Sequence, residues 1–382
     1  MHYNGPMREI FVKTCQDAST KARNGYIDLP HGRVITPAFM PVGTNGTVKG
    51  IYHDKVEAIG YRLILGNTYH LYLRPGTDVI GQFGGLHEFS NWNHNILTDS
   101  GGFQIFSLPG LRKVKKEGVS FQSHIDGSRH FFSPEKVVDI QHILGSDIAM
   151  TLDYCTPPDI TYKKAIEALK ITEEWGQRSV DHVKSISDFR GNLFAIVQGN
   201  FFRDLRKESA EFVSSLDTPG IAIGGLSVGE KPEVFKDFLA YTMDMLPENK
   251  PRYVMGIGSP DYLLEAVQDG VDIFDCVMAT RMARHGTVFT DDGPISLSKA
   301  QWAFDKGPIE SGCTCDACTR YSRAYLRHMF KAEEMFGGML ATEHNLTYLY
   351  HLMERTREAI QKGCFADFKK DYLERYYFKK QD

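Results

Sequence analysis

The sequence predicts a (β/α)8 (TIM) barrel with an N-terminal β hairpin and an inserted subdomain near the C-terminus. Eight short apolar segments recur along the 382 residues, and longer helical patterns follow most of them. Continuous apolar strands that alternate with helices indicate a parallel sheet covered on both faces, and eight such units is the number in this barrel. The predicted strands are 34–42, 61–65, 95–99, 147–153, 192–198, 220–226, 252–256 and 271–276.

The composition limits the class of protein. Apolar residues make up 42% and charged residues 24% of the chain, which is typical of a folded globular protein and excludes disorder and coiled coil. The apolar segments are far shorter than the roughly 20 residues of a membrane-spanning helix, and no secretory signal is visible, so we expect a cytoplasmic protein outside the membrane. The net charge of −4 neither requires nor excludes a polyanionic partner.

Turn signals predict three hairpins beside the barrel strands. Residues 10–34 alternate β-forming residues around Asn24-Gly25 and a later glycine, which predicts a hairpin that caps the barrel. Residues 118–132 surround an Asp-Gly pair and predict a hairpin between barrel strands three and four. Residues 287–297 repeat that signal after strand eight.

The clearest helical connections lie in the middle of the chain. Ser133, Pro134 and Glu135 have the form of an N-cap with proline at the first helical position, and the helical pattern runs to Gly145. A second helical pattern covers residues 162–186.

The reacting groups of this barrel type lie at the C-terminal ends of the strands. The sequence places three carboxylates and an amide at such ends. One strand-end aspartate is often only a helix N-cap, but three on one rim indicate a site. The strand-end segments are Asp99 to Gln104, Asp153 to Cys155, Gln198-Gly199, Gly224 to Leu226 and Asp275-Cys276.

These residue types suit chemistry at a glycosidic carbon next to a purine. Of two facing carboxylates, one can attack C1′ while the other handles the proton of the departing group. A third carboxylate can accept from N1–H and N2–H of a guanine-like base, while an amide and a backbone N–H donate to O6. Asp153, Gln198 and the Gly225 amide can supply these groups, although aspartate and glutamine serve many ligands.

The most specific motif is Cys313-x-Cys315-x2-Cys318, followed at a distance by His344. Three close thiolates and an imidazole are the four ligands of a closed tetrahedral zinc site. Four protein ligands leave no open position for water, so we expect one structural zinc ion (Zn²⁺) per subunit. The cysteines outside this motif, Cys15, Cys276 and Cys364, are expected to be ordinary small side chains.

Two groups of basic residues could contact phosphates. Arg281 and Arg284 follow Asp275 by six and nine residues, where they can hold phosphates beside an attacked ribose. The basic run over residues 112–116 is more typical of a solvated loop.

These motifs resemble one known family, the bacterial-type tRNA-guanine transglycosylases (queuine tRNA-ribosyltransferase family). The resemblance covers nearly the whole chain and follows the family's order of motifs. It is carried by residues 36–44 (TPAFMPVGT), 65–71 (LGNTYHL), 97–104 (LTDSGGFQ) and 274–276 (FDC), together with the metal motif.

The resemblance implies an enzyme, usually a homodimer, that acts on the anticodon loop of tRNAs with a GUN anticodon in queuosine biosynthesis. Such an enzyme exchanges guanine at the wobble position for 7-aminomethyl-7-deazaguanine (preQ1). The match makes Asp275 the nucleophile that forms a covalent intermediate with the ribose, and Asp99 the general acid and base. It makes Phe103 and Met255 the apolar pair around the base, and the Leu226 carbonyl the acceptor for the aminomethyl group.

Further positions match the family's binding residues. The base-binding matches are Ser100, Gly101, Gly102, Phe103, Asp153, Cys155, Gln198, Gly225, Leu226, Val228 and Met255. The RNA-binding matches are Gly256, Ile257, Gly258, Ser259, Pro260, Asp261, Tyr262, Thr280, Arg281, Met282, Ala283 and Arg284.

Two positions favour preQ1 over the larger base queuine. Val228 and Cys155 resemble the bacterial enzymes, whereas eukaryotic queuine enzymes usually have a smaller residue at the position of Val228. Two others depart from the family pattern: Ala279 replaces a common proline and His285 a common asparagine, which affects loop rigidity and fine RNA contacts.

Two other functions were weighed against this one. A zinc-dependent barrel hydrolase or deaminase is disfavoured, because the chain has no His-x-His or His-Glu-x-x-His motif. A non-catalytic RNA-binding subunit is disfavoured because both Asp99 and Asp275 are present. We therefore expect a barrel with its hairpin over residues 1–290, a zinc-binding subdomain over 291–348 and a C-terminal helix that closes the barrel over 349–382.

Overall fold

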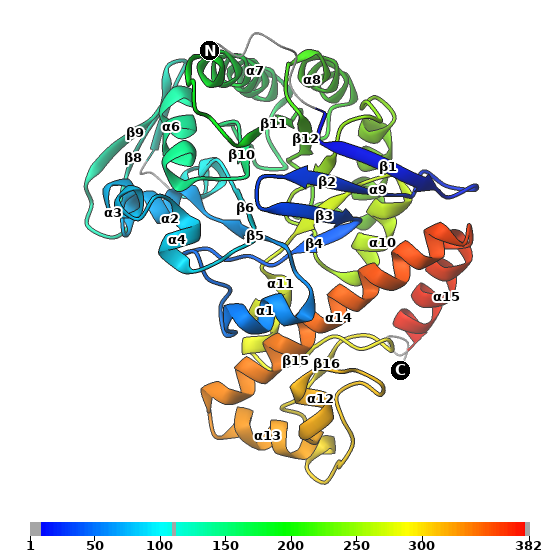
Figure 1. Ribbon diagram of the computed structural model, residues 1–382. Helices are drawn as coiled ribbons and strands as arrows, with labels where there is room; N and C mark the ends of the chain where they lie inside the picture. Colours follow the sequence, from blue (N-terminus) through cyan, green and yellow to red (C-terminus); the bar gives the residue numbers. More distant parts are fainter. Residues whose placement is uncertain (1–8, 109–111, 379–382) are drawn as a thin grey trace.

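The computed structural model describes residues 9–108 and 112–378. Residues 1–8 of the predicted barrel domain and 379–382 of the predicted C-terminal helix lie outside this part. Figure 1 shows a strand barrel surrounded by helices, with a smaller helical subdomain below it. In the described part of the chain, no helix is both long enough and apolar enough to span a membrane.

Eight parallel strands form the barrel, in the order β4-β14-β13-β12-β11-β10-β6-β5. The ring closes where the Leu65 N–H donates to Pro41 O at 3.0 Å and the Gly43 N–H donates to Leu65 O at 2.6 Å. Each strand overlaps a predicted segment, so the predicted (β/α)8 barrel is confirmed. The strands are β4 (Ala38–Met40), β5 (Leu63–Gly66), β6 (Asn95–Thr98), β10 (Ile148–Met150), β11 (Asn192–Val197), β12 (Gly220–Ile223), β13 (Arg252–Val254) and β14 (Ile273–Asp275).

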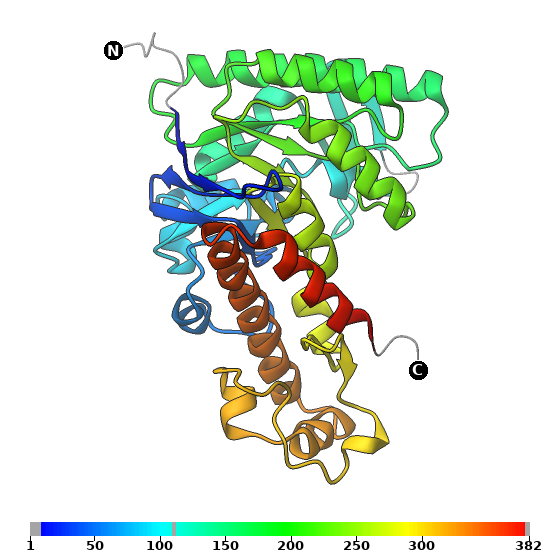
Figure 2. The ribbon, with the colours of Figure 1, turned by 90° about the vertical axis from the view of Figure 1, so that its right-hand side faces the viewer.

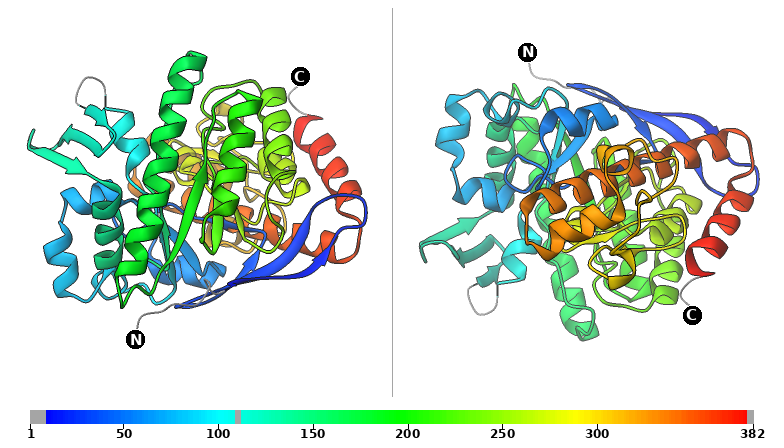
Figure 3. Two further views of the ribbon diagram at one scale, coloured as in Figure 1. Left: turned by 90° about the horizontal axis from the view of Figure 1, so that it is seen from above. Right: turned by 90° about the horizontal axis from the view of Figure 1, so that it is seen from below.

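Helices between the strands cover the barrel, as the views from above and below show (Figure 3). The helix α6 begins where the sequence predicted, since Ser133 Oγ accepts from Lys136 N and Gly145 ends the helix at φ +72°. The helices are α1 (His53–Ile59), α2 (Thr68–Leu73), α3 (Thr77–Gln82), α4 (Leu86–Ser90), α5 (Gly102–Phe106), α6 (Pro134–Leu144), α7 (Tyr162–Ser185), α8 (Arg203–Ser215), α9 (Pro232–Met243), α10 (Pro260–Gln268) and α11 (Met278–Arg284).

Side chains of the barrel strands alternate between two cores. One core joins outward strand residues to the helices, and Ile96 and Phe274 belong to it. The other consists of strand and strand-end residues such as Leu97 and Ile273, and it fills the barrel. This alternation decides which side chains at the strand ends point into the barrel mouth.

An antiparallel sheet of three strands, β1 (Phe11–Gln16), β2 (Arg23–Leu29) and β3 (Gly32–Thr36), packs against the core inside the barrel. The prediction of a turn at Asn24-Gly25 was wrong, because both residues lie inside β2. A Cβ at Gly25 would lie 2.9 Å from the Phe11 ring and 2.5 Å from Val12 O. Glycine is therefore needed here because the two strands approach each other closely, and not because the chain turns.

The other two predicted hairpins are present. The strands β8 (Gly118–Gln122) and β9 (Arg129–Phe132) pair with each other, and β15 (Thr287–Val288) pairs with β16 (Ile295–Ser296). Most of the basic run at 112–116 forms a third strand, β7 (Arg112–Lys115), instead of the predicted loop. It pairs with β8 and keeps its basic side chains exposed.

The lower subdomain contains η1 (Ala300–Trp302), α12 (Asp316–Arg320), α13 (Arg323–Lys331) and the first part of α14 (Met335–Gln361). Figure 2 shows α14 running from this subdomain up along the barrel. Residue 348, the predicted end of the zinc-binding subdomain, lies inside this helix. The helix continues past it because Leu349, Leu352 and Met353 extend its apolar face into the barrel's outer core. A separate helix, α15 (Phe365–Phe378), follows it, so residues 349–378 contain the end of α14 and all of α15 instead of one helix.

A buried ion pair ties the N-terminal sheet to the barrel. Arg23 Nε donates to Asp272 Oδ1 at 3.0 Å and Arg23 Nη2 to Asp272 Oδ2 at 2.6 Å, and the two side chains are 2% and 0% exposed. We expect Arg23→Met to lower the free energy of unfolding by about 3–5 kcal/mol, because it leaves a buried carboxylate without its cation. Urea unfolding measures this loss. Arg33→Met, which removes an exposed pair with Asp28, should cause no measurable change.

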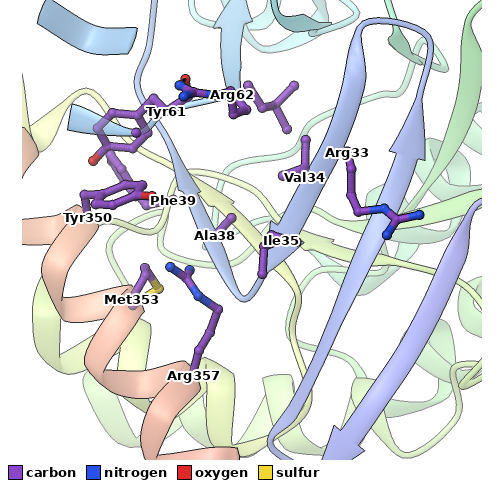
Figure 4. Close-up of a pocket in the computed structure, with 12 residues that line it drawn as sticks. Arg33, Val34, Ile35, Ala38, Phe39, Tyr61, Arg62, Tyr350, Met353 and Arg357 are labelled. Atoms are coloured by element: carbon purple, nitrogen blue, oxygen red, sulfur yellow. Dashed lines mark hydrogen bonds between the residues drawn. The ribbon is translucent and has the colours of Figure 1, made fainter. Parts of the chain in front are cut away.

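A cavity of about 210 Å³ lies between β3, β4 and α14. Figure 4 shows Tyr61, Tyr350, Met353 and Arg357 along its border. Ala38 and Leu63, the first residues of their barrel strands, also line it. The cavity is therefore at the N-terminal ends of the strands, opposite the end where the candidate site lies.

Candidate active site

Four predicted site residues follow directly from the alternation of side chains in the barrel. Each lies two positions after a residue of the inner core, so its side chain points to the barrel interior at the C-terminal end of a strand. The pairs are Leu97 and Asp99, Ile196 and Gln198, Tyr253 and Met255, and Ile273 and Asp275.

Asp275 ends β14 and is held by two hydrogen bonds to the same oxygen. Tyr253 Oη donates to Asp275 Oδ1 at 2.6 Å and the Gly256 N–H donates to it at 2.9 Å. Burial raises the pKa of Asp275, while these two hydrogen bonds lower it. Among the described residues no hydrogen bond reaches Oδ2, which leaves that oxygen available for attack on a substrate.

Asp99 is fixed by the start of α2 and by its own turn. The Thr68 N–H donates to Asp99 Oδ1 at 2.9 Å and the Gly101 N–H at 3.2 Å, while Asn67 Nδ2 donates to Oδ2. Burial raises the pKa of Asp99 to about 7, and the nearby charge of Asp275 adds to this rise. A carboxyl group with such a pKa can donate and accept protons near neutral pH.

Asp153 and Gln198 meet at the floor of the mouth, as the sequence predicted. Gln198 Nε2 donates to Asp153 Oδ2 at 2.7 Å, and Ser100 Oγ donates to Oδ1 at 3.3 Å. Cys155 Sγ donates to Oδ2 at 3.3 Å. Burial raises the pKa of Asp153, while these donors lower it. The four side chains form one polar group against which the edge of a flat base can hydrogen-bond.

The loop after β12 approaches this group closely. Gly225 has φ +68°, a left-handed conformation that favours glycine, and a Cβ there would lie 2.6 Å from Gln198 Oε1. The N–H groups of Ser227 and Val228 donate to the carboxylate of Glu230. Because C=O and N–H point in opposite directions in a trans peptide, the Leu226 carbonyl points away from Glu230.

The apolar candidates lie at the same end of the barrel. Phe103, on α5, is 61% exposed, which is unusual for a phenylalanine and leaves a ring face free to stack. Met255 is half-buried and packs against the inner core. The turn before Phe103 is stabilised by Gly102, whose N–H donates to Ser100 Oγ at 3.2 Å.

The two predicted RNA-binding segments are a loop that enters α10 and the helix α11. Arg281 is exposed and Arg284 is half-buried, with its Nη1 donating to Thr280 O at 3.0 Å. The side chains of Ile257, Thr280 and Ala283 are buried, so any contact from these residues to RNA has to use backbone atoms.

The predicted metal ligands Cys313, Cys315, Cys318 and His344 come together in the lower subdomain. Cys313 Sγ lies 3.5 Å from Cys315 Sγ, and His344 Nδ1 lies 3.3–3.7 Å from the three sulfurs. A tetrahedral zinc ion with Zn–S bonds of about 2.3 Å requires ligand atoms roughly 3.3–3.8 Å apart. His344 Nε2 donates to Phe289 O at 2.8 Å, which leaves Nδ1 free to bind a metal. The four residues can therefore hold a metal ion.

A second group, His31, His87 and Asp147, also brings metal-binding side chains together. Its two imidazole rings stack with centroids 3.8 Å apart and planes 19° apart. An imidazole binds a metal in its ring plane, and two nearly parallel planes do not meet at one ion. Each ring instead bonds to one oxygen of Asp147, at 2.6 and 3.0 Å, so we interpret the group as a hydrogen-bonded cluster.

Three residues contact the site without having been assigned a role from the sequence. They are Tyr253, which holds Asp275, Asn67, which holds Asp99, and Glu230, which binds the loop amides. Asn67 lies in the family motif at residues 65–71, and Glu230 lies in the loop after a barrel strand. Their positions in the sequence could therefore have indicated a place near the site. Tyr253 lies inside a strand, and only the alternation of the completed barrel directs its hydroxyl to the site.

Buried carboxylates gathered at the C-terminal mouth of a parallel barrel define the class to which this protein belongs, the (β/α)8-barrel enzymes. Comparison with known proteins narrows the class. The model of a family described as queuine tRNA-ribosyltransferase matches residues 17–378. The chain belongs to that family, which confirms the resemblance found in its motifs.

Individual relatives support the same family. A queuine tRNA-ribosyltransferase of Borrelia recurrentis is 52% identical over 361 residues, which cover 94% of this chain and 96% of the relative. A queuine tRNA-ribosyltransferase of Treponema denticola is 52% identical over 370 residues, which cover 97% of this chain and 98% of the relative. One of a Thermoanaerobacter species is 52% identical over 366 residues, which cover 96% of this chain and 97% of the relative.

Proposed function

We propose that this protein is a tRNA-guanine transglycosylase that replaces guanine at the wobble position of GUN-anticodon tRNAs by preQ1, in queuosine biosynthesis. The observation that carries the proposal is the convergence of Asp275, Asp99 and the Asp153–Gln198 pair at one barrel mouth in a member of this family. One carboxylate attacks, the second transfers protons and the third reads the base.

Asp275 acts as the nucleophile. Its Oδ2 attacks C1′ of the ribose, the C1′–N9 bond breaks, and guanine leaves as Asp99 donates its proton to it. The product is an ester between the RNA and Asp275. The incoming base then gives its N9 proton to Asp99, its N9 attacks C1′, and the ester bond breaks to restore the Asp275 carboxylate.

Base recognition rests on the polar group at the floor of the mouth. Asp153 accepts from N1–H and N2–H of the base, and Gln198 and the Gly225 N–H donate to O6. In this arrangement Gln198 has to turn its amide from Asp153 to the base. The rings of the base lie between Phe103 and Met255, which keep water away from the ester.

The preference for preQ1 is supported by the loop after β12. The bonds from Ser227 and Val228 to Glu230 direct the Leu226 carbonyl to the other side of the peptide. A carbonyl turned to the base pocket accepts from the aminomethyl group of preQ1, which guanine lacks. Val228 and Cys155 limit the room for the larger side chain of queuine.

The remaining parts of the proposal concern binding and assembly. Arg281 and Arg284 contact RNA phosphates beside the extruded nucleotide. The Cys3His group holds one structural zinc ion, which orients the lower subdomain and takes no part in the reaction. Exposed apolar side chains on that subdomain, such as Phe304 at 94% and Met335 at 85%, support a homodimer. The tRNA substrate places the enzyme in the cytoplasm.

The pKa of Asp99 predicts opposite pH dependence for the two half-reactions. Release of guanine needs the protonated acid, so the rate of adduct formation should fall as pH rises through about 7. Discharge of the adduct by preQ1 needs the ionised base, so its rate should rise through the same pH. Single-turnover measurements of each step between pH 5.5 and 8.5 test this. In Asp99→Asn both rates should be low, and neither rate should show a pH dependence centred near pH 7.

The proposal as a whole is tested by incorporation of labelled guanine. We expect label to enter an unmodified tRNA with a GUN anticodon, to leave on a chase with unlabelled preQ1, and not to enter a tRNA whose wobble guanine is replaced. Absence of incorporation by folded, zinc-replete protein would contradict the proposal and would favour the non-catalytic RNA-binding subunit.

A further inference from the structure

The helix α8 carries a buried cation, Arg206, to which the proposed reaction gives no role. The side chain is 0% exposed. Its Nε donates to Asn200 O at 2.9 Å. Within the part of the chain that the structure describes, Nη1 and Nη2 have no hydrogen-bond partner. A buried guanidinium with two free amino groups is costly, so its retention needs a reason.

The end of this side chain lies close to Gly225 in the loop that approaches the base. Arg206 Nη2 is 3.3 Å from the position that a Cβ would take on Gly225. Gln198 Oε1 lies 2.6 Å from the same position. Arg206 is thus close to Gly225, whose N–H is one of the two groups proposed to donate to O6 of the base, and it approaches the same side of Gly225 as Gln198.

The charge of Arg206 matters to the same loop. Burial lowers the pKa of Arg206 to about 9, so the guanidinium stays charged at neutral pH, and the carboxylate of Glu230 favours that charge. Glu230 in turn accepts the N–H groups of Ser227 and Val228. Ser227 has φ +59°, a left-handed conformation that is costly for a residue other than glycine. The loop therefore needs support from outside its own backbone.

We propose that Arg206 is a positioning residue for base selection, whose buried guanidinium holds the 224–230 loop with the Leu226 carbonyl turned to the base pocket. It does so by balancing the charge of Glu230 and by offering its two free amino groups to loop carbonyls when a base is bound. The inference rests on the proposed function. Guanine has no aminomethyl group, so its binding is weakened less than that of preQ1 when the loop is no longer held.

The test compares Arg206→Met with Lys207→Met, which removes an exposed cation from the next position of the same helix. KM and kcat are measured for preQ1 and for labelled guanine with one tRNA, and melting temperatures are recorded. For Arg206→Met we expect the KM for preQ1 to rise about 10-fold, the KM for guanine about 2-fold and kcat to stay nearly unchanged, because the loop then holds the Leu226 carbonyl less well for the aminomethyl group that only preQ1 has. Lys207→Met should match the wild type.

An equal rise of both KM values, or no rise in either, would overturn the role of Arg206. Arg206→Lys decides the matter if Arg206→Met does not fold, because it keeps the charge but has fewer donors, and it should show the same preference for guanine in weaker form. Adding Glu230→Gln to either variant should raise the KM for preQ1 less than it does in the wild type. If the wild type incorporates neither base, the proposed function fails; a wild type that incorporates both leaves it standing whatever the variants do.

Discussion

The Asp275→Asn variant is expected to form no covalent adduct with RNA and to turn over about 10⁴-fold more slowly than the wild type, or slower still. An amide oxygen is a poor nucleophile, so the ester with the ribose does not form. The fold should survive, because the amide oxygen of asparagine can accept the same bonds from Tyr253 Oη and the Gly256 N–H. Denaturing gels after incubation with a tRNA anticodon stem-loop detect the adduct, and labelled guanine exchange measures turnover.

Asp159→Asn provides the matched control, since Asp159 is exposed in the loop after β10. It should form the adduct as the wild type does. Survival of the adduct in Asp275→Asn would assign the nucleophile to another residue, and Asp99, the other carboxylate of this pair, would be examined next.

The second large effect is expected from Cys318→Ser. The hydrophobic core of the lower subdomain is small, with Val288, Leu297, Leu326 and Leu340 among its members. Small cores depend on metals or disulfides, and zinc binding contributes on the order of 10 kcal/mol in zinc-finger peptides. We expect the zinc content to fall from one ion per chain to near zero, and the subdomain to become sensitive to protease.

Activity should fall together with the metal. Asn345 follows the proposed ligand His344 on α14, and its Nδ2 donates to Ala279 O at 2.9 Å in the helix that carries Arg281. Loss of order around His344 therefore reaches the segment directly after Asp275. Cys364→Ser, which changes an exposed cysteine outside the metal group, should retain zinc and activity. A soluble, metal-free and fully active Cys318→Ser protein would show that the site is dispensable.

Much of the candidate site could be predicted because the barrel has a simple rule. Once a segment is known to be a barrel strand, polar residues at its C-terminal end are candidates for the mouth, and this rule points to Asp99, Gln198 and Asp275. The metal group could be predicted from the cysteine spacing, because a tetrahedral ion demands close thiolates.

The rest depended on contacts between distant parts of the chain. Asn24-Gly25 has the composition of a turn, and only the position of the Phe11 ring shows why a glycine is needed inside a strand. The hydroxyl of Tyr253 on β13 reaches Asp275 on the neighbouring strand β14, and no local sequence pattern predicts this contact. Arg206 is similar, since a charged residue in an amphipathic helix is expected on the solvent side and not buried against a loop.

The unbroken helix α14 has a consequence for how the protein can be divided. Its 27 residues, about 40 Å at ~1.5 Å per residue, contribute Leu340 and Ala341 to the lower core and Leu349 and Leu352 to the barrel's outer core. No cut in this helix leaves both cores complete. The lower subdomain is therefore not a transferable module, and the two cores should melt in one cooperative transition.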